Sequence, residues 1–207
     1  PSHLDDEKNE DEKPKSYSTD VPYLEINKIV ESTRPKNHDE NEKAKPRFDY
    51  SDFGTIAHAY MEGVVKNEEP VILQKNIAEI SGTEKLNKVL EICSEMAEKF
   101  RQSELGKEAI NSEWHKCEYD FIWRLPSKDG NDKIMNGSID LVFKNSQGKY
   151  TIVDYKTDSQ INPNEHYVQL NCYRKVFSEL IGCDEKDINC VLYYLRYGKA
   201  VDITDNL

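Results

Sequence analysis

Residues 137–143 read Gly-Ser-Ile-Asp-Leu-Val-Phe, and residues 150–158 read Tyr-Thr-Ile-Val-Asp-Tyr-Lys-Thr-Asp. Each run alternates apolar residues with other residues, which predicts two half-buried β-strands. Between them, the sequence Ser146-Gln147-Gly148 predicts a tight hairpin loop with the glycine in the left-handed conformation. The stretch therefore predicts a β-hairpin, and its register decides what its polar residues can do together.

The register predicted by this loop sets two aspartates opposite each other. Asn145 pairs with Lys149 across the loop, and continuing the ladder brings Asp140 opposite Asp154. Directly paired residues share a face of the sheet, with Cβ atoms about 5 Å apart. Lys156 lies two residues beyond Asp154 and projects from the same face. Two carboxylates and an ammonium converge there, which predicts a divalent-metal site; a slip of one residue would separate the aspartates.

A solvated charged face is the alternative interpretation of these residues. Aspartate is depleted in strands, yet one lies inside each apolar run. Like charges opposed across a ladder are destabilising unless something neutralises them. A bound cation would do so, and so would Lys156 alone, so the residues leave both readings open.

The pattern G-x-I-D-L-V-F followed by I-V-D-Y-K-T-D closely resembles the PD-(D/E)XK nuclease superfamily. Within it, the chain resembles the RecB-like nuclease domain at the C-terminal end of helicase–nucleases that process DNA ends. The resemblance covers roughly residues 51–200 and implies a restriction-endonuclease-like α/β fold with a mixed central sheet flanked by helices. It also implies a Mg²⁺- or Mn²⁺-dependent deoxyribonuclease, with exonuclease action in DNA-end processing and recombinational repair.

The resemblance assigns roles residue by residue. Gly54-Thr55-x-x-His58 resembles the family's opening motif, in which the histidine reaches the metal from a helix beside the sheet. The implied metal ligands are His58, Asp140, Asp154 and the backbone carbonyl of Tyr155. The implied catalytic residues are Asp140, Asp154 and Lys156, with Lys156 in an electrostatic role.

Three further residues receive weaker roles. Glu118 fits the place of a glutamate at the start of a strand in relatives; it would join the metal cluster, bind a water in the outer shell, or lie at an exposed edge. Gln169 and Tyr173 are four residues apart and share a helix face. Q-x-x-x-Y after the D-Y-K strand resembles the family's pattern, which implies contact with DNA.

Periodicity and turn residues predict the order of elements around the hairpin. Helices are expected at 51–64 and 83–101, a strand at 118–125, a helix from 162–164 to Gly182, and strands at 189–197 and 199–203. This order predicts an α/β sandwich around a mixed sheet. Residues 1–46 are expected to be an acidic, largely disordered linker with a short apolar island at 21–26, and residues 47–207 to be the nuclease domain.

Composition limits the class of protein. Charged residues make up 32% and hydrophobic residues 37% of the chain, and no apolar run approaches the ~20 residues of a membrane span. No signal peptide opens the chain, so we expect a cytoplasmic protein. The five cysteines show no close C-x-x-C pair, which argues against the iron–sulfur cluster that some relatives carry.

A formal net charge of −11 disfavours binding to phosphates. The chain begins with Pro1 rather than methionine, which suggests a segment of a longer protein whose other domains supply a basic surface. The expected partners are DNA and helicase domains, in the same polypeptide or in a partner subunit; alone, the segment should bind DNA weakly. A catalytically silent nuclease-fold module that guides DNA or scaffolds a helicase is the alternative. No nucleophile elbow or Cys–His signature supports a cysteine hydrolase.

Overall fold

The computed structural model describes residue 28 and residues 48–78, 80, 82–125 and 133–207. The linker expected at residues 1–46, with its apolar island, lies outside the described residues apart from Lys28, and the division of the chain into linker and domain stays a prediction. The helices are α2 (Tyr50–Lys66), α3 (Gln74–Ile77), α4 (Thr83–Gln102), α5 (Glu104–Ile110) and α6 (Tyr167–Ile181), with short 3₁₀ turns η1 (Pro163–His166), η2 (Glu185–Asp187) and η3 (Thr204–Asn206). The strands are β1 (His115–Leu125), β2 (Lys133–Lys144), β3 (Tyr150–Lys156), β4 (Ile188–Tyr194) and β5 (Lys199–Asp202).

The strands form a five-stranded sheet in the order β1-β2-β3-β4-β5. β3 and β4 run parallel and the other neighbours run antiparallel. The parallel pair requires a crossover, which α6 supplies. The fold is thus the mixed, helix-flanked α/β sheet that the sequence predicts.

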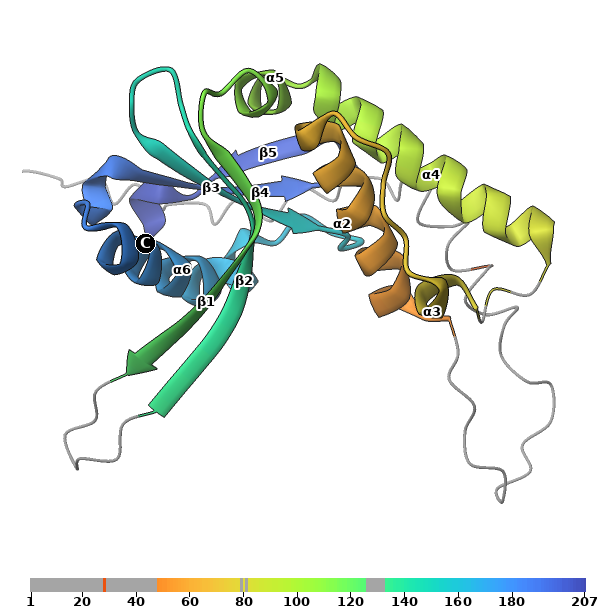
Figure 1. Cartoon of the computed structure of the whole chain (residues 1–207), viewed down its shortest axis with the longest axis horizontal. Helices are drawn as coiled ribbons and strands as arrows, with labels where there is room; N and C mark the ends of the chain where they lie inside the picture. Colours follow the sequence, from red (N-terminus) through yellow and green to blue (C-terminus); the bar gives the residue numbers. More distant parts are fainter. Residues whose placement is uncertain (1–27, 29–47, 79, 81, 126–132) are drawn as a thin grey trace, which may run out of the picture.

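Helices cover both faces of this sheet (Figure 1). A first core, on one face, joins α2 and α4 to side chains such as Val153 and Tyr155 of β3. A second core, on the other face, joins α6 to side chains such as Ile152 of β3 and Leu192 of β4. Successive residues of β3 therefore feed alternate layers, as a strand buried on both faces must.

The hairpin of β1 and β2 changes layers in its middle. Cys117 and Leu141, nearest the loop that joins β2 to β3, pack in the first core. Tyr119 and Ile139, two residues farther along, pack in the second core. The strands continue from there as a two-stranded arm (Figure 1). The change of layers falls at Glu118 and Asp140, between the helices of both faces.

Two glycines end elements where the sequence predicts. Gly148 of the hairpin loop has φ 80° and Gly182 after α6 has φ 70°, both in the left-handed region that glycine enters without steric cost. The strand boundaries differ from expectation: β1 begins at His115 rather than at residue 118, and β4 ends at Tyr194 because residues 195–198 form a turn. Within the described part of the chain, no helix combines the length and the apolar character needed to cross a membrane.

Candidate functional site

Acidic residues lie on three neighbouring strands. The β2–β3 ladder keeps the predicted register as far as Leu141 and Val153, and Asp140 and Asp154 are the next residues on each strand, just beyond this last pair. The β1–β2 ladder keeps one register on both sides of Glu118, which therefore stands opposite Asp140 from the other strand. Asp140 is the middle carboxylate of a row that crosses β1, β2 and β3.

The backbone of Glu118 is irregular at this row. Its φ of 47° lies in the left-handed region, which is uncommon for a residue with a side chain. Such conformations are costly and concentrate at functional sites. The carboxylate accepts a hydrogen bond from Ser138 Oγ at 3.2 Å. Burial raises the pKa of Glu118, although the side chain remains exposed on one side.

His58 reaches this row from α2. The helix starts in a capping box between Asp49 and Asp52, and the His58 ring meets the Tyr155 ring of β3 edge-on, with the centroids 5.7 Å apart. Nδ1 of His58 lies 3.5 Å from Oδ1 of Asp140. Burial lowers the pKa of His58, against the raising effect of the charge on Glu118. The neutral imidazole that results is the form that binds metals.

His58, Glu118 and Asp140 together form a candidate metal site. Each offers one ligand atom, and these atoms lie within 4.8 Å of one another. The sequence predicts His58 and Asp140 as ligands and gives Glu118 only a marginal role. Asp154, the other carboxylate predicted as a ligand, lies outside this trio, on the neighbouring strand.

The electrostatics of the two aspartates fit a cation. Burial raises the pKa of Asp140 to about 7, against the lowering effect of the hydrogen bond that it accepts from the Tyr155 backbone N–H at 2.7 Å. Burial also raises the pKa of Asp154 to about 6, and the charge on Asp140 adds to the rise. Crowded carboxylates in a dry site ionise with difficulty unless a positive charge joins them. Oxygen ligands of this kind suit Mg²⁺ or Mn²⁺.

Lys156 supplies a positive charge on the α6 side of the row. Its Nζ lies 2.5 Å from Asp154 Oδ2 and donates a hydrogen bond to Gln169 Oε1 at 3.1 Å. Nε2 of Gln169 in turn donates to the hydroxyl of Tyr173 at 2.9 Å. Gln169 and Tyr173 do share a helix face, as their spacing predicts, and the hydrogen bonds connect them to the lysine. Contact between this pair and DNA stays a prediction.

The side chain and the backbone of Tyr155 have different roles. Its ring is 4% exposed and packs edge-on against Phe100, with the ring centroids 5.5 Å apart. The ring therefore serves in packing. Its backbone lies within hydrogen-bonding reach of His58, which raises the pKa of the imidazole. This contact keeps the backbone of Tyr155 beside the candidate metal site.

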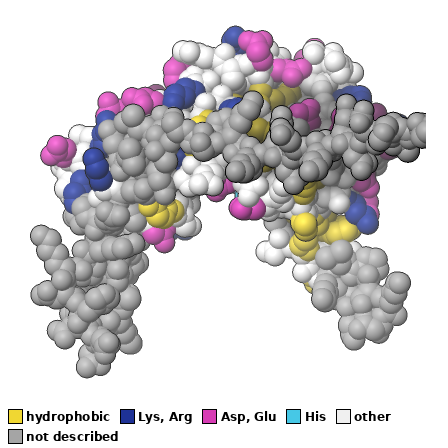
Figure 2. Space-filling model, turned by 180° about the vertical axis from the view of Figure 1, so that it is seen from behind, with side chains coloured by type: hydrophobic (Ala, Val, Ile, Leu, Met, Phe, Trp, Pro, Cys, Tyr) yellow, Lys and Arg dark blue, Asp and Glu magenta, His cyan; other side chains and the backbone are white. Residues whose placement is uncertain are grey.

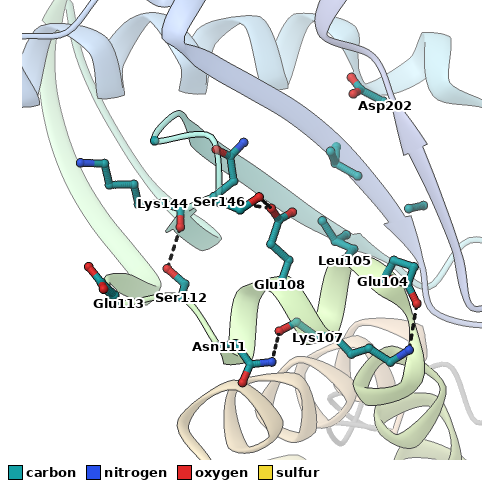
Figure 3. Close-up of a pocket in the computed structure, with 14 residues that line it drawn as sticks. Glu104, Leu105, Lys107, Glu108, Asn111, Ser112, Glu113, Lys144, Ser146 and Asp202 are labelled. Carbon is teal, nitrogen blue, oxygen red and sulfur yellow. Dashed lines mark hydrogen bonds and ion pairs between the residues drawn. The ribbon is translucent and has the colours of Figure 1, made fainter.

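The candidate metal site borders a cavity of about 300 Å³ that contains His58 and Glu118 in its lining. A larger cavity of about 1060 Å³ lies near the loop that joins β2 to β3 (Figure 3). Two ends of its wall are closed by side-chain hydrogen bonds: Lys107 donates to Glu104 at 2.8 Å, and Glu108 accepts from Ser146 Oγ at 3.0 Å. None of the residues of the candidate metal site lines it. The smaller cavity is therefore the one connected to the site chemistry.

Comparison with known proteins gives the family of the chain. The solved structure described as "Crystal structure of SSO0001" aligns with 88% of this chain and 75% of its own chain, at 12% sequence identity and a TM-score of 0.33. No curated protein matches the chain in sequence. A model of the PD-(D/E)XK nuclease superfamily matches residues 35–203, which include every residue of the row of acids, His58, Lys156 and the pair on α6. The chain therefore belongs to the PD-(D/E)XK nuclease superfamily.

Proposed function

We propose that this chain is a Mg²⁺- or Mn²⁺-dependent nuclease that hydrolyses phosphodiester bonds of DNA. One observation carries the proposal. A histidine from α2, carboxylates from three adjacent strands and a lysine from β3 converge at the place where the β1–β2 hairpin changes layers. Nuclease chemistry needs these residue types together: hard oxygen ligands for a divalent cation and a fixed positive charge beside them.

The residues divide into ligands and helpers. Asp140 and Asp154 would hold the cation, with His58 and the backbone carbonyl of Tyr155 completing the set, and Glu118 is placed to join it directly or through water. When bound, the cation would polarise the phosphoryl oxygen and lower the pKa of a water molecule. Nδ1 of His58 already lies on the Asp140 side of the site, which supports its role as a ligand.

Lys156 would act through charge. An ammonium has three N–H donors. One donates a hydrogen bond to Gln169, and an ion pair with Asp154 holds the ammonium in place. The ammonium would orient the attacking water or stabilise negative charge that develops on the phosphate. Asp154 belongs to the row of acids and forms an ion pair with Lys156, so it would link the metal to the lysine.

The wider context is the C-terminal exonuclease domain of a helicase–nuclease that processes DNA ends. The support is the resemblance of the hairpin, His58 motif and Q-x-x-x-Y motif to RecB-like domains. The net charge of −11 is consistent with a domain that receives its DNA from a neighbour. Helicase domains, in the same polypeptide or in a partner subunit, would be that neighbour.

The test is cleavage of end-labelled single- and double-stranded DNA with Mg²⁺, Mn²⁺ or EDTA. Asp154→Asn keeps the size of the side chain and removes its charge; Asp120→Asn, an exposed aspartate on β1, is the matched control. Metal-dependent cleavage that is lost in Asp154→Asn and kept in Asp120→Asn is expected. Metal binding without cleavage, even with helicase domains added back, would favour the catalytically silent module instead.

A further inference from the structure

We propose that the 300 Å³ cavity beside the candidate metal site binds one unpaired nucleobase of the substrate strand, next to the bond that is cut. This inference rests on the proposed nuclease function and adds a substrate class to it: single-stranded or locally unpaired nucleic acid. The cavity lies between α2 and the segment that connects α2 to α3. Its lining residues are Thr55, Ile56, His58, Ala59, Glu62, Val71, Ile72, Leu73, Asn76 and Glu118.

Position links the cavity to the chemistry. His58 and Glu118 belong both to the cavity wall and to the trio whose ligand atoms lie within 4.8 Å of one another. A phosphate bound at the metal would therefore have its attached nucleoside at the mouth of the cavity. The cavity is continuous with the site, and its occupant must be part of the same strand.

The walls match a base better than a phosphate. Val71 is 77% exposed and Leu73 is 52% exposed, so large aliphatic side chains face solvent without a partner in the fold. Glu62 is neutralised by its ion pair with Lys66, whose Nζ lies 2.5 Å from Oε1, which leaves Glu118 as the lining carboxylate that would repel a phosphodiester. No lysine or arginine is among the lining residues to attract one. A nucleobase is uncharged and offers a flat apolar face. The amide of Asn76 offers a donor and an acceptor for its polar edge, and Thr55 Oγ1, which donates its proton to the Ser51 carbonyl at 3.0 Å, can accept.

The apolar wall is held in place by a glycine. The segment after α2 returns alongside the helix (Figure 1). A Cβ on Gly63 would lie 2.8 Å from the carbonyl oxygen of Glu68 and 3.2 Å from the nitrogen of Pro70. Instead, the backbone N–H of Glu68 donates to the Gly63 carbonyl at 2.9 Å. This close approach fixes Val71 beside the helix that carries His58.

The proposal selects unpaired substrate for an energetic reason. A base inside a duplex must leave its stack and its partner before it can enter a pocket, which costs free energy. A base in a single strand has no partner to leave.

Figure 2 shows the molecule hollowed between the β1–β2 arm and the α2–α3 end, with hydrophobic side chains exposed on either side of the hollow.

The experiment combines truncation of two side chains of the pocket wall with removal of one base from the substrate. The protein variants are Val71→Ala/Leu73→Ala and, as a matched control, Leu180→Ala, a 48% exposed leucine on α6 that does not line the cavity. The substrate is a single-stranded oligonucleotide whose cleaved bond has been mapped. The nucleotide on each side of that bond is replaced in turn by an abasic residue, and kcat/KM is measured for every combination.

Wild type and Leu180→Ala are expected to lose about tenfold in kcat/KM on one of the two abasic strands. On the intact strand, kcat/KM of Val71→Ala/Leu73→Ala should be about tenfold below that of wild type. On the abasic strand, kcat/KM of this variant should fall by less than about a further twofold, because the two deletions remove the same interaction. An equal abasic penalty in all three proteins would overturn the pocket, and so would equal rates of the double variant and the control on the intact strand.

Binding separates this proposal from the proposed function. The same strands are titrated onto the full chain with Ca²⁺ in place of Mg²⁺, with a 2-aminopurine beside the mapped bond as a fluorescent reporter of stacking; should no bond be cut, the reporter is moved along the strand. Quenching that Val71→Ala/Leu73→Ala abolishes would support the pocket even in a protein that cleaves nothing. Identical affinity and quenching in the double variant and the control would overturn the pocket while leaving nuclease activity intact.

Discussion

The side-chain oxygen of Gln169 accepts a hydrogen bond from Nζ of Lys156 at 3.1 Å. A helix on one face of the sheet thereby fixes the position of a cation on the central strand. The hydroxyl of Tyr173 accepts from the amide of the same glutamine and fixes its orientation. The geometry gives the Gln–Tyr pair a second role besides the contact with DNA that the sequence predicts: it positions the lysine.

The two roles predict different kinetics. If Gln169 positions Lys156, Gln169→Leu should lower kcat by about 10- to 100-fold with little change in KM, because hydrogen bonds to charged groups contribute about 1.5–3 kcal/mol. Tyr173→Phe should give a smaller loss of the same kind. Steady-state kinetics on a single strand measures both. A raised KM at unchanged kcat would instead assign the pair to DNA binding.

Lys156→Ala should separate metal binding from catalysis. We expect kcat to fall by about 10²- to 10⁴-fold, the range typical of a positioned catalytic group. Affinity for Mn²⁺ should stay the same or rise, because Asp154 loses the ammonium 2.5 Å away that competes for its oxygen. Calorimetric titration with Mn²⁺ and a single-turnover cleavage assay provide the two readouts. A variant that cuts at the wild-type rate would refute the assignment of Lys156.

The metal-free protein should lose stability as the pH rises. Burial raises the pKa of Asp140 to about 7 and that of Asp154 to about 6, above the value of about 4 in an unfolded chain. The folded state therefore binds protons that the unfolded state releases, and this stabilisation is complete below about pH 4 and is lost as the pH passes 6 to 7. Urea unfolding in EDTA at pH 5 and pH 7.5 measures it. Asp140→Asn/Asp154→Asn should gain stability over wild type at pH 7.5 and much less at pH 5, and Mn²⁺ should reverse the order at pH 7.5.

Glu118→Gly should cost little stability and yet weaken metal binding. Glycine enters the left-handed region at no steric cost, so the substitution removes about 1–2 kcal/mol of strain at φ 47° and partly offsets the entropy that glycine costs in a strand. Asp120→Gly, in regular strand conformation two residues away, lacks this compensation and should be the less stable variant. Only Glu118→Gly should weaken Mn²⁺ binding. Thermal unfolding without metal and a Mn²⁺ titration are the measurements; equal destabilisation by the two glycines would argue against strain at Glu118.

Local patterns were enough to predict the sheet and much of the site. The hairpin loop fixes the register at Asn145 and Lys149, whose backbones do pair at 2.7 Å from N to O, and the ladder keeps this register as far as Leu141 and Val153. Helical spacing sets His58 on the same face of α2 as Thr55 and Glu62, and these side chains line one cavity. Both inferences rely on residues close in sequence, where geometry is determined by the repeat of the strand or helix.

Contacts between distant elements were beyond the same reasoning. The Lys156–Gln169 hydrogen bond depends on how α6 crosses the sheet, which no spacing within either element defines. The position of Glu118 depends on one backbone angle. The register alone would have set Glu118 opposite Asp140 had the pairing of β1 with β2 been known. The cavity wall at Val71 likewise depends on the close approach at Gly63, which reads in the sequence as an ordinary helical glycine.

Because the fold has two cores, the intrinsic tryptophan fluorescence of the protein reports the unfolding of one of them. Both tryptophans of the chain, Trp114 and Trp123, pack in the second core, where Trp114 meets Tyr150 edge-on and Trp123 donates a hydrogen bond to Glu179. Their emission will follow the loosening of the α6 layer and will be nearly silent about the layer of α2 and α4. A thermal unfolding curve recorded by tryptophan emission can therefore show a single transition even when α2, the helix that carries His58, has unfolded at a lower temperature. Agreement between emission and far-ultraviolet circular dichroism is the check that the two layers unfold as one.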